Sequence, residues 1–330
     1  MLSRVANSLY WMDRYLERAE NTARMIESQL HMLLDLPLMR KDPFAWKPLV
    51  DITGDGHYFS EHFSSFSRED VIYFHTFDRN YPNSIISCLT AARENARSVR
   101  EVITSEMWEN INRLYLDISE PGARHWVTKS PHKFYSQIKM ASHLIQGIAY
   151  STMAHGEAWN FSQLGRFLER ADKTSRILDV KYFIILPRID YVGTSMDNVQ
   201  WTALLKSTSS LEMYRKRFNL ISSGNIVQFL IFDREFPRSI LYCINHAQEA
   251  FLKINGTPSG AFNSELARSL GRLTGKLNYS TIKGVMEQGL HQYLDEIQSD
   301  LNNIGESIYE TYFAMKPISD ASTQTQSQLQ

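Results

Sequence analysis

Hydrophobic positions recur at helical spacing along most of the chain. In the first segment Leu16, Ala19, Ala23 and Ile26 lie three or four residues apart, and no Gly or Pro interrupts residues 5–36. Side chains at this spacing share one face of an α-helix, so the pattern predicts a long helix that ends at Pro37. The same pattern predicts further helices at 83–118, 132–153, 159–186, 263–276 and 281–315. No alternating run long enough to build a sheet occurs, and the predicted fold class is all-α, a helical bundle.

Much of the sequence is written twice. RYLERAENTARMI at 14–26 matches RFLERADKTSRIL at 166–178, and the block from Ile72 matches the block from Val227, including the FDRxxP motif and one cysteine each. Matching blocks in the same order predict an internal duplication. We expect two units related by pseudo-twofold symmetry, at 1–155 and 156–316. The stretches 37–68 and 187–223 are rich in breakers and are predicted to be loops, and the polar tail 317–330 is predicted to be disordered.

A charged stripe follows the repeated helix on the side opposite its apolar stripe. Its first copy consists of Arg14, Glu17, Arg18, Asn21 and Arg24, and its second copy of Arg166, Glu169, Arg170, Thr174 and Arg176. One interpretation is an exposed face with local pairs between residues one turn apart. The other is that the two stripes face each other and guanidinium forks hold Glu17 and Glu169. Such a network would be either a buried structural lock or an anion-binding cleft.

The FDRxxP motifs predict helix starts with Pro82 and Pro237 at the first helical position. Within them lie the candidate residues Asp78, Arg79, Asp233 and Arg234. The aspartates could accept hydrogen bonds from backbone N–H groups at these helix starts, with the arginines paired locally. Alternatively, all four side chains could line the mouth of the cleft between the two stripes.

Composition excludes several classes of protein. Lys and Arg number 35 against 36 for Asp and Glu, which gives a formal charge of −1 and argues against nucleic acid or an anionic membrane as a partner. The longest apolar stretches fall short of the roughly 20 residues that a bilayer-spanning helix needs, and the N-terminus lacks the pattern of a secretory signal. Cys88 and Cys243 form no CxxC pair and are predicted to be buried thiols. We therefore expect a cytoplasmic protein.

Motifs for an autonomous active site are not found. None of the histidines follows a glutamate by three residues, as a carboxylate-bridged di-metal bundle would require. A loop set, Asp55, His57, Glu61 and His62, could hold a metal but has no match in the second unit. No GxSxG occurs, and GRLTGKL at 271–277 has the wrong spacing for a phosphate loop. The sequence thus predicts no catalytic residue, metal or cofactor and favours a non-catalytic protein.

The segments MLSRVANSLYWMDRYLERAENTAR, EAWNFSQLGRFLERADKTSRILDV and SIYETYF together resemble the bacterial alpha-E domain family; Asp13 departs from the small residue usual there. The resemblance implies a wholly helical fold of unassigned biochemistry. It also implies neighbours or fusion partners among circularly permuted ATP-grasp ligases and transglutaminase-like peptidases. The expected function is a non-catalytic helical partner of such an amide ligase. The alternatives are a helical transferase or ligand-binding protein with an Arg/Glu-lined anion cleft, and a scaffold that dimerises.

Overall fold

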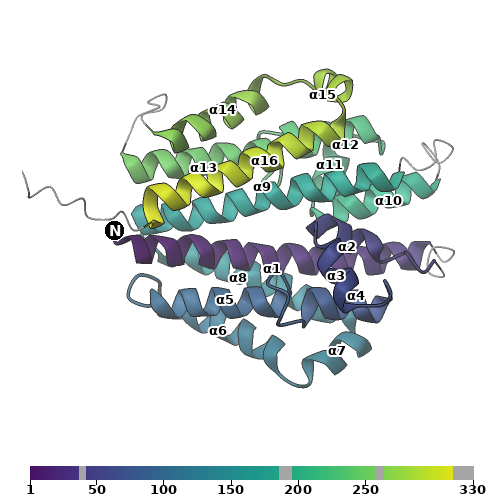
Figure 1. Ribbon diagram of the computed structural model, residues 1–330, viewed down its shortest axis with the longest axis horizontal. Coiled ribbons are helices and arrows are strands. Elements are labelled where there is room, and N and C mark those ends of the chain that lie inside the picture. Colours follow the sequence, from purple (N-terminus) through teal and green to yellow (C-terminus); the bar gives the residue numbers. More distant parts are fainter. Residues whose placement is uncertain (37–41, 186–194, 257–263, 315–330) are drawn as a thin grey trace, which may run out of the picture.

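The computed structural model describes residues 1–36, 42–185, 195–256 and 264–314. Within these ranges every regular element is a helix and there is no strand (Figure 1). The all-α prediction is therefore confirmed. A continuous cluster of buried apolar side chains runs through both halves of the chain, so the helices share one core.

The helices follow one another along the chain with short connections. Residues 1–155 form α1 (Ser3–Asp35), α2 (Lys47–Thr53), α3 (Gly56–His62), α4 (Arg68–Thr76), α5 (Ile85–Ser98), α6 (Ser105–Ser119), α7 (Ala123–Lys129) and α8 (Pro131–Thr152). The remainder forms α9 (Glu157–Ile185), α10 (Ser195–Ser207), α11 (Leu211–Arg217), α12 (Ser223–Phe232), α13 (Ile240–Asn255), α14 (Glu265–Tyr279), α15 (Ile282–Gln288), α16 (Leu290–Ile308) and the short π-helix η3 (Tyr309–Phe313).

The long helices α1 and α9 lie side by side at the centre of the molecule (Figure 1). Helix α1 packs against α5 and α8, and both of these helices contact α6. In the second half α9 packs against α13 and α16, and both of these contact α14. The same order of packing thus occurs in both halves. This correspondence is what a duplication would produce, while the duplication itself and the boundary at residue 155 remain predictions.

Helices α1 and α9 lie close together where Gly165 faces Tyr10 of α1. A Cβ atom at this position would lie 2.2 Å from the backbone oxygen of Tyr10. Only glycine leaves room for so close an approach of two backbones. Because α1 is enclosed by helices on several sides, polar and charged residues of its repeated motif are buried along with the apolar ones.

Several predicted boundaries were wrong. The expected helix 83–118 is split into α5 and α6, with the side chain of Thr104 capping the second helix at Met107 N. The expected helix 281–315 is split at Gly289, whose φ of 102° is strained for other residues. The predicted loop regions 37–68 and 187–223 contain short helices. The predicted helix ends at Pro37 and Pro187, and the tail 317–330, lie outside the described residues.

The FDRxxP motifs do not place proline at the first helical position. Instead Ser84 and Ser239 are the N-caps of α5 and α13, and their hydroxyl groups accept hydrogen bonds from Ser87 N and Tyr242 N. A serine at the N-cap satisfies a backbone donor that the helix leaves unpaired. Each proline therefore belongs to the turn that precedes the cap.

Candidate functional site

The repeated charged stripes meet between α1 and α9. The two helices run in the same direction, since the amino group of Met1 contacts Glu157 and later residues of α1 contact later residues of α9. The side chains of Glu17 and Glu169 are 0% exposed at this contact. An exposed charged stripe, the first of the two interpretations, is therefore wrong.

Each helix supplies a glutamate to the arginine of the other. Arg18 Nε and Nη2 donate to Glu169 Oε1 and Oε2 at 2.6 and 2.9 Å. In the reciprocal pair, Arg170 Nε and Nη2 donate to Glu17 Oε1 and Oε2 at 2.9 and 2.7 Å. Both are two-pronged, charge-assisted pairs, the strongest type of ion pair in proteins. Such reciprocity is what the predicted pseudo-twofold relation between the two helices would produce.

Further cations surround these carboxylates. Arg14 Nε donates to Glu169 Oε2 at 2.9 Å, and Lys173 Nζ lies 3.6 Å from Glu169 Oε1. On the other side Arg238 Nη1 donates to Glu17 Oε1 at 3.1 Å and to Asn21 Oδ1 at 2.8 Å. Each buried glutamate thus faces at least two positive groups.

Arg238 is a central residue that the sequence reasoning missed. It directly precedes the N-cap Ser239, and at the same point of the first FDRxxP block stands Asn83, whose Oδ1 accepts from Arg18 Nη1 at 2.7 Å. The turn before α5 and the turn before α13 therefore both send one side chain into the network. Its position directly after the second FDRxxP motif was the only indication in the sequence that Arg238 belongs to the network.

A second layer of the network lies around Glu20. Its carboxylate accepts from Arg24 Nε and Nη2 at 2.8 and 2.7 Å, and it also contacts Arg238. Ser142 of α8 donates to Glu20 Oε2 at 2.5 Å. In α9 the equivalent local pair joins Arg176 Nε to Asp172 Oδ1 at 2.9 Å. Local pairs and pairs between the helices are therefore joined into two connected sets, one around Glu17 and Glu20 and one around Glu169 and Asp172.

The network keeps its carboxylates ionised. Burial alone would raise the pKa of Glu17, Glu20 and Glu169, but the surrounding guanidinium groups outweigh it and hold the pKa of each below its ordinary value. Ionised carboxylates occupy the guanidinium donors that an incoming anion would need. The arrangement is that of a structural lock rather than of an open anion-binding cleft.

Arg166 departs from the pattern set by its counterpart Arg14. It donates to Gln163 and lies over the ring of Phe167 at 4.9 Å, and its Nε atom has no hydrogen-bond partner within the described ranges. Arg238 occupies the side of Glu17 that Arg166 would otherwise face. The two halves of the network are therefore similar but not identical.

The chain matches the model of a known protein family. The model of the Alpha-E family, described as a predicted alpha-helical domain with a conserved ER motif, matches residues 1–313. The chain belongs to the Alpha-E family. Its two Glu-Arg pairs at 17–18 and 169–170 fit that description, and they are the residues that cross-bind between α1 and α9.

Relatives of this Alpha-E chain occur in mycobacteria. Uncharacterised proteins of Mycobacterium bovis and Mycobacterium tuberculosis are 22% identical to it over 94% of this chain. The match covers only 37% of each relative, so the chain spans little more than a third of their length. No solved structure matches the chain.

The aspartates of the FDRxxP motifs organise turns in this Alpha-E fold. Asp78 Oδ1 accepts from Asn80 N at 2.9 Å, and Asp233 Oδ1 accepts from Phe236 N at 2.8 Å. Both aspartates are buried, whereas Arg79 and Arg234 are exposed and join no ion pair in the described part of the chain. The prediction that the aspartates accept hydrogen bonds from backbone N–H groups near the helix starts is thus confirmed. The predicted local pairing of the two arginines is wrong, and the four side chains do not line the mouth of a cleft.

The remaining candidates for chemistry have structural surroundings. His57 and Glu61 lie on α3 rather than on a loop, and Asp55 accepts from the hydroxyl of Tyr81. Burial raises the pKa of Cys88 and of Cys243 to about 12, so neither thiol is a nucleophile at neutral pH. No helix in the described ranges is both long enough and apolar enough to cross a bilayer.

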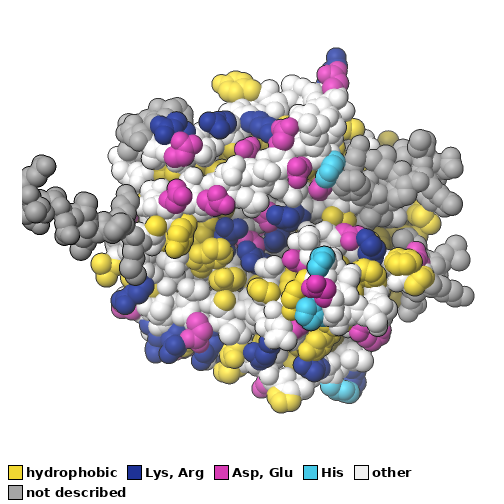
Figure 2. Space-filling view, viewed as in Figure 1, with side chains coloured by type: hydrophobic (Ala, Val, Ile, Leu, Met, Phe, Trp, Pro, Cys, Tyr) yellow, Lys and Arg dark blue, Asp and Glu magenta, His cyan; other side chains and the backbone are white. Residues whose placement is uncertain are grey.

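One hollow borders the network on the surface of this Alpha-E domain. It has a volume of about 600 Å³ and is lined by Trp11 and Arg14 of α1, Asp172 of α9, and Glu306 and Tyr309 near the end of α16, among others. Figure 2 shows hydrophobic and basic side chains together along the seam between α1 and α16. Arg14 and Asp172 of the network thus line a hollow that is large enough for a small molecule.

Proposed function

We propose that this Alpha-E chain is a non-catalytic helical partner of a circularly permuted ATP-grasp amide ligase, in a system that also includes a transglutaminase-like peptidase. The observation that carries the proposal is the mutual binding of the two Glu-Arg motifs. Because their donors and acceptors are consumed between α1 and α9, the motif builds the fold and is not available for a reaction. The external surface is then left to recognise a partner.

The length of the mycobacterial relatives supports a role as a module. Their Alpha-E-like region makes up 37% of a longer chain, so in those proteins this region is covalently joined to further sequence. Interfaces between domains of one chain resemble transient protein–protein interfaces, so we expect a region that is joined to further sequence to present such a contact surface.

An apolar face of α8 supports a protein-protein contact. Met140, Leu144 and Tyr150 lie within a third of a turn of one another around this helix and are 63%, 53% and 66% exposed. Large apolar side chains gathered on one exposed helix face are typical of protein interfaces. We therefore assign this face as the ligase-docking surface in the proposal.

Co-purification tests the proposal directly. The chain is expressed with the ATP-grasp ligase encoded in the same genome, and complex formation and ligase turnover are measured with and without it. We expect a stable complex that Leu144→Asp weakens at least tenfold, while the control Tyr279→Asp, at an 89% exposed side chain on α14, leaves it intact. No complex and no change in ligase turnover would refute the proposed function.

The hollow beside Arg14 gives a specific reason to keep the second candidate function, a helical transferase or ligand-binding protein. The anion cleft expected from the sequence is disfavoured, because the side chains that would line it already bind one another: Arg18 binds Glu169, and Arg170 binds Glu17. The test is a thermal-shift screen of anionic metabolites on wild type and Arg14→Gln. A shift that the variant loses would favour ligand binding over the partner role.

A further inference from the structure

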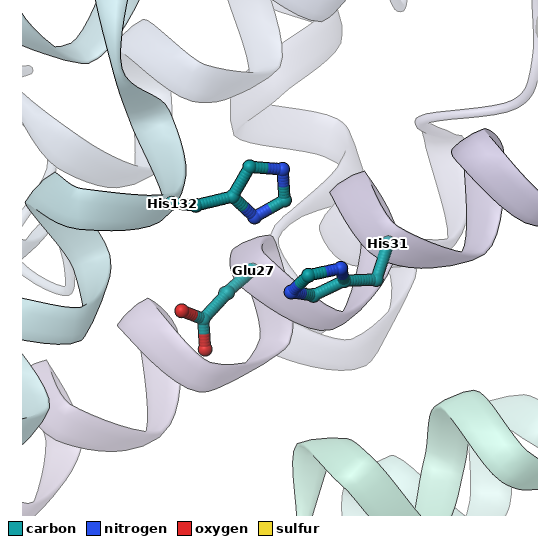
Figure 3. Close-up of side chains that lie close together, drawn as sticks. All are labelled: Glu27, His31 and His132. Carbon is teal, nitrogen blue, oxygen red and sulfur yellow. The ribbon is translucent and has the colours of Figure 1, made fainter.

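Three side chains able to bind metal meet where the end of α1 approaches the start of α8. Glu27 and His31 are one turn apart on α1, and His132 is the second residue of α8. Their potential ligand atoms all lie within 4.8 Å of one another. Figure 3 shows the carboxylate and the two imidazole rings gathered in the space between the two helices.

We propose that Glu27, His31 and His132 form a binding site for a divalent transition-metal ion such as Zn²⁺. This inference is independent of the partner function proposed above. Two imidazole nitrogens and one carboxylate oxygen suit zinc and similar ions, and three protein ligands leave a fourth position for water or another ligand. Zinc ligands at about 2.1 Å in a tetrahedron are roughly 3.4 Å apart, so small side-chain rotations would bring these atoms to bonding positions.

The two histidines are in a state suited to a metal. Their ring centroids are 4.2 Å apart, and the Nδ1 atom of His132 is buried without a hydrogen-bond partner among the described residues. Neutral imidazoles offer the lone pairs that a metal ion needs, and a bound ion would provide the partner that His132 lacks.

Charged groups around the site set its affinity. Lys139 of α8 contacts the Glu27 carboxylate through its ammonium group. Lys139 therefore competes with a metal ion for Glu27. Removal of its charge should tighten metal binding, an effect that a purely structural Glu27–Lys139 pair would not produce.

The local sequence does not predict this group. A carboxylate-bridged di-metal bundle carries glutamate three residues before histidine, whereas Glu27 precedes His31 by four residues, a spacing that also places both on one helix face. The third ligand comes from a different helix and enters only through the packing of α8 against α1. This proximity is a property of the tertiary structure and has no local sequence signature.

Titration of the untagged, metal-free full chain with Zn²⁺ by calorimetry tests the site, and Co²⁺ absorbance reports the ligand set. We expect one ion per chain, with affinity at least tenfold lower in His31→Ala and in His132→Ala. The control His57→Ala, at an 89% exposed side chain on α3, should bind as wild type does. Absence of saturable binding, or unchanged affinity in both ligand variants, would overturn the proposal.

Two further measurements test whether the variants fold and whether Glu27 is a ligand. Circular dichroism and the metal-free melting temperature establish that the variants fold, and the exposed His31 carries the test if His132→Ala does not fold. Lys139→Met is expected to raise Zn²⁺ affinity several-fold. Unchanged or weaker binding in Lys139→Met would remove Glu27 from the ligand set and so contradict the site as proposed.

Discussion

Replacement of Arg170 by methionine should strongly destabilise the fold. The guanidinium group makes two charge-assisted hydrogen bonds to Glu17, at 2.9 and 2.7 Å, and the glutamate side chain is 0% exposed. Loss of two such bonds at about 1.5–3 kcal/mol each would cost about 3–6 kcal/mol. Because Arg238 still faces Glu17, we expect the lower part of that range, about 3 kcal/mol, in line with other buried pairs broken on one side.

The assay is equilibrium unfolding in urea, followed by circular dichroism, with a matched exposed pair as control. Arg268 and Glu265 on α14 form an ion pair in which both side chains are more than half exposed, so Arg268→Met should cost at most about 1 kcal/mol. The double variant Glu17→Gln with Arg170→Met should cost less than the sum of the single variants, because the two residues bind each other. Equal costs for Arg170→Met and Arg268→Met would refute the structural lock.

The dependence on pH provides a second check of the same pair. The pKa of Glu17 is held below its ordinary value in the folded state, so its contribution to stability is complete above the unfolded value of about 4.3. As the pH falls through the lower, folded pKa, this contribution is lost. The difference in unfolding free energy between wild type and Arg170→Met should therefore shrink in acid and stay constant above about pH 5.

Three other substitutions or treatments test separate parts of the fold. Burial raises the pKa of Asp13 from 3.8 to about 6. This group should therefore lower the unfolding free energy of wild type by about 3 kcal/mol as the pH rises from about 4 to about 7. Urea titrations across that range should show that Asp13→Asn lacks this decrease. Gly165→Ala should lower stability by at least about 2 kcal/mol in thermal unfolding, because its Cβ would collide with Tyr10 O. Cys88 and Cys243, both fully buried, should resist iodoacetamide at pH 8 in the native protein and react in urea, as mass spectrometry can show; rapid native labelling would contradict their burial.

The sequence was sufficient for what depends on local periodicity. The long helices α1 and α9 were predicted within two residues at the bounds the structure describes, since an uninterrupted apolar stripe at helical spacing has no other regular solution. The internal break after Ser98 was not predicted, because residues 99–104 contain neither Gly nor Pro. Helix α5 ends at Ser98, and α6 begins after the N-cap Thr104. Neither boundary is marked by a helix-breaking residue in the sequence.

The candidate site was predicted only in part. The meeting of the two stripes, with Glu17 and Glu169 held by guanidinium groups, was one of two interpretations that the repeat allowed, and it is the one the structure shows. The entry of Arg238 could not, since it depends on how the turn before α13 folds over α9. The same holds for Ser142 of α8, whose contact with Glu20 joins residues 122 positions apart.

The buried network also explains how α1 and α9 find one alignment. Apolar stripes alone would allow one helix to slide along the other by a turn, because leucine, alanine and isoleucine contacts are interchangeable in kind. A shift of one turn would separate Arg18 from Glu169 and Arg170 from Glu17 together, and at least one ionised carboxylate would be left buried without its two-pronged arginine partner. Unpaired buried charges are far more costly than imperfect apolar contacts. The reciprocal Glu-Arg pairs therefore fix the register of the two central helices, and with it the position of every helix that packs on them, including the exposed face of α8.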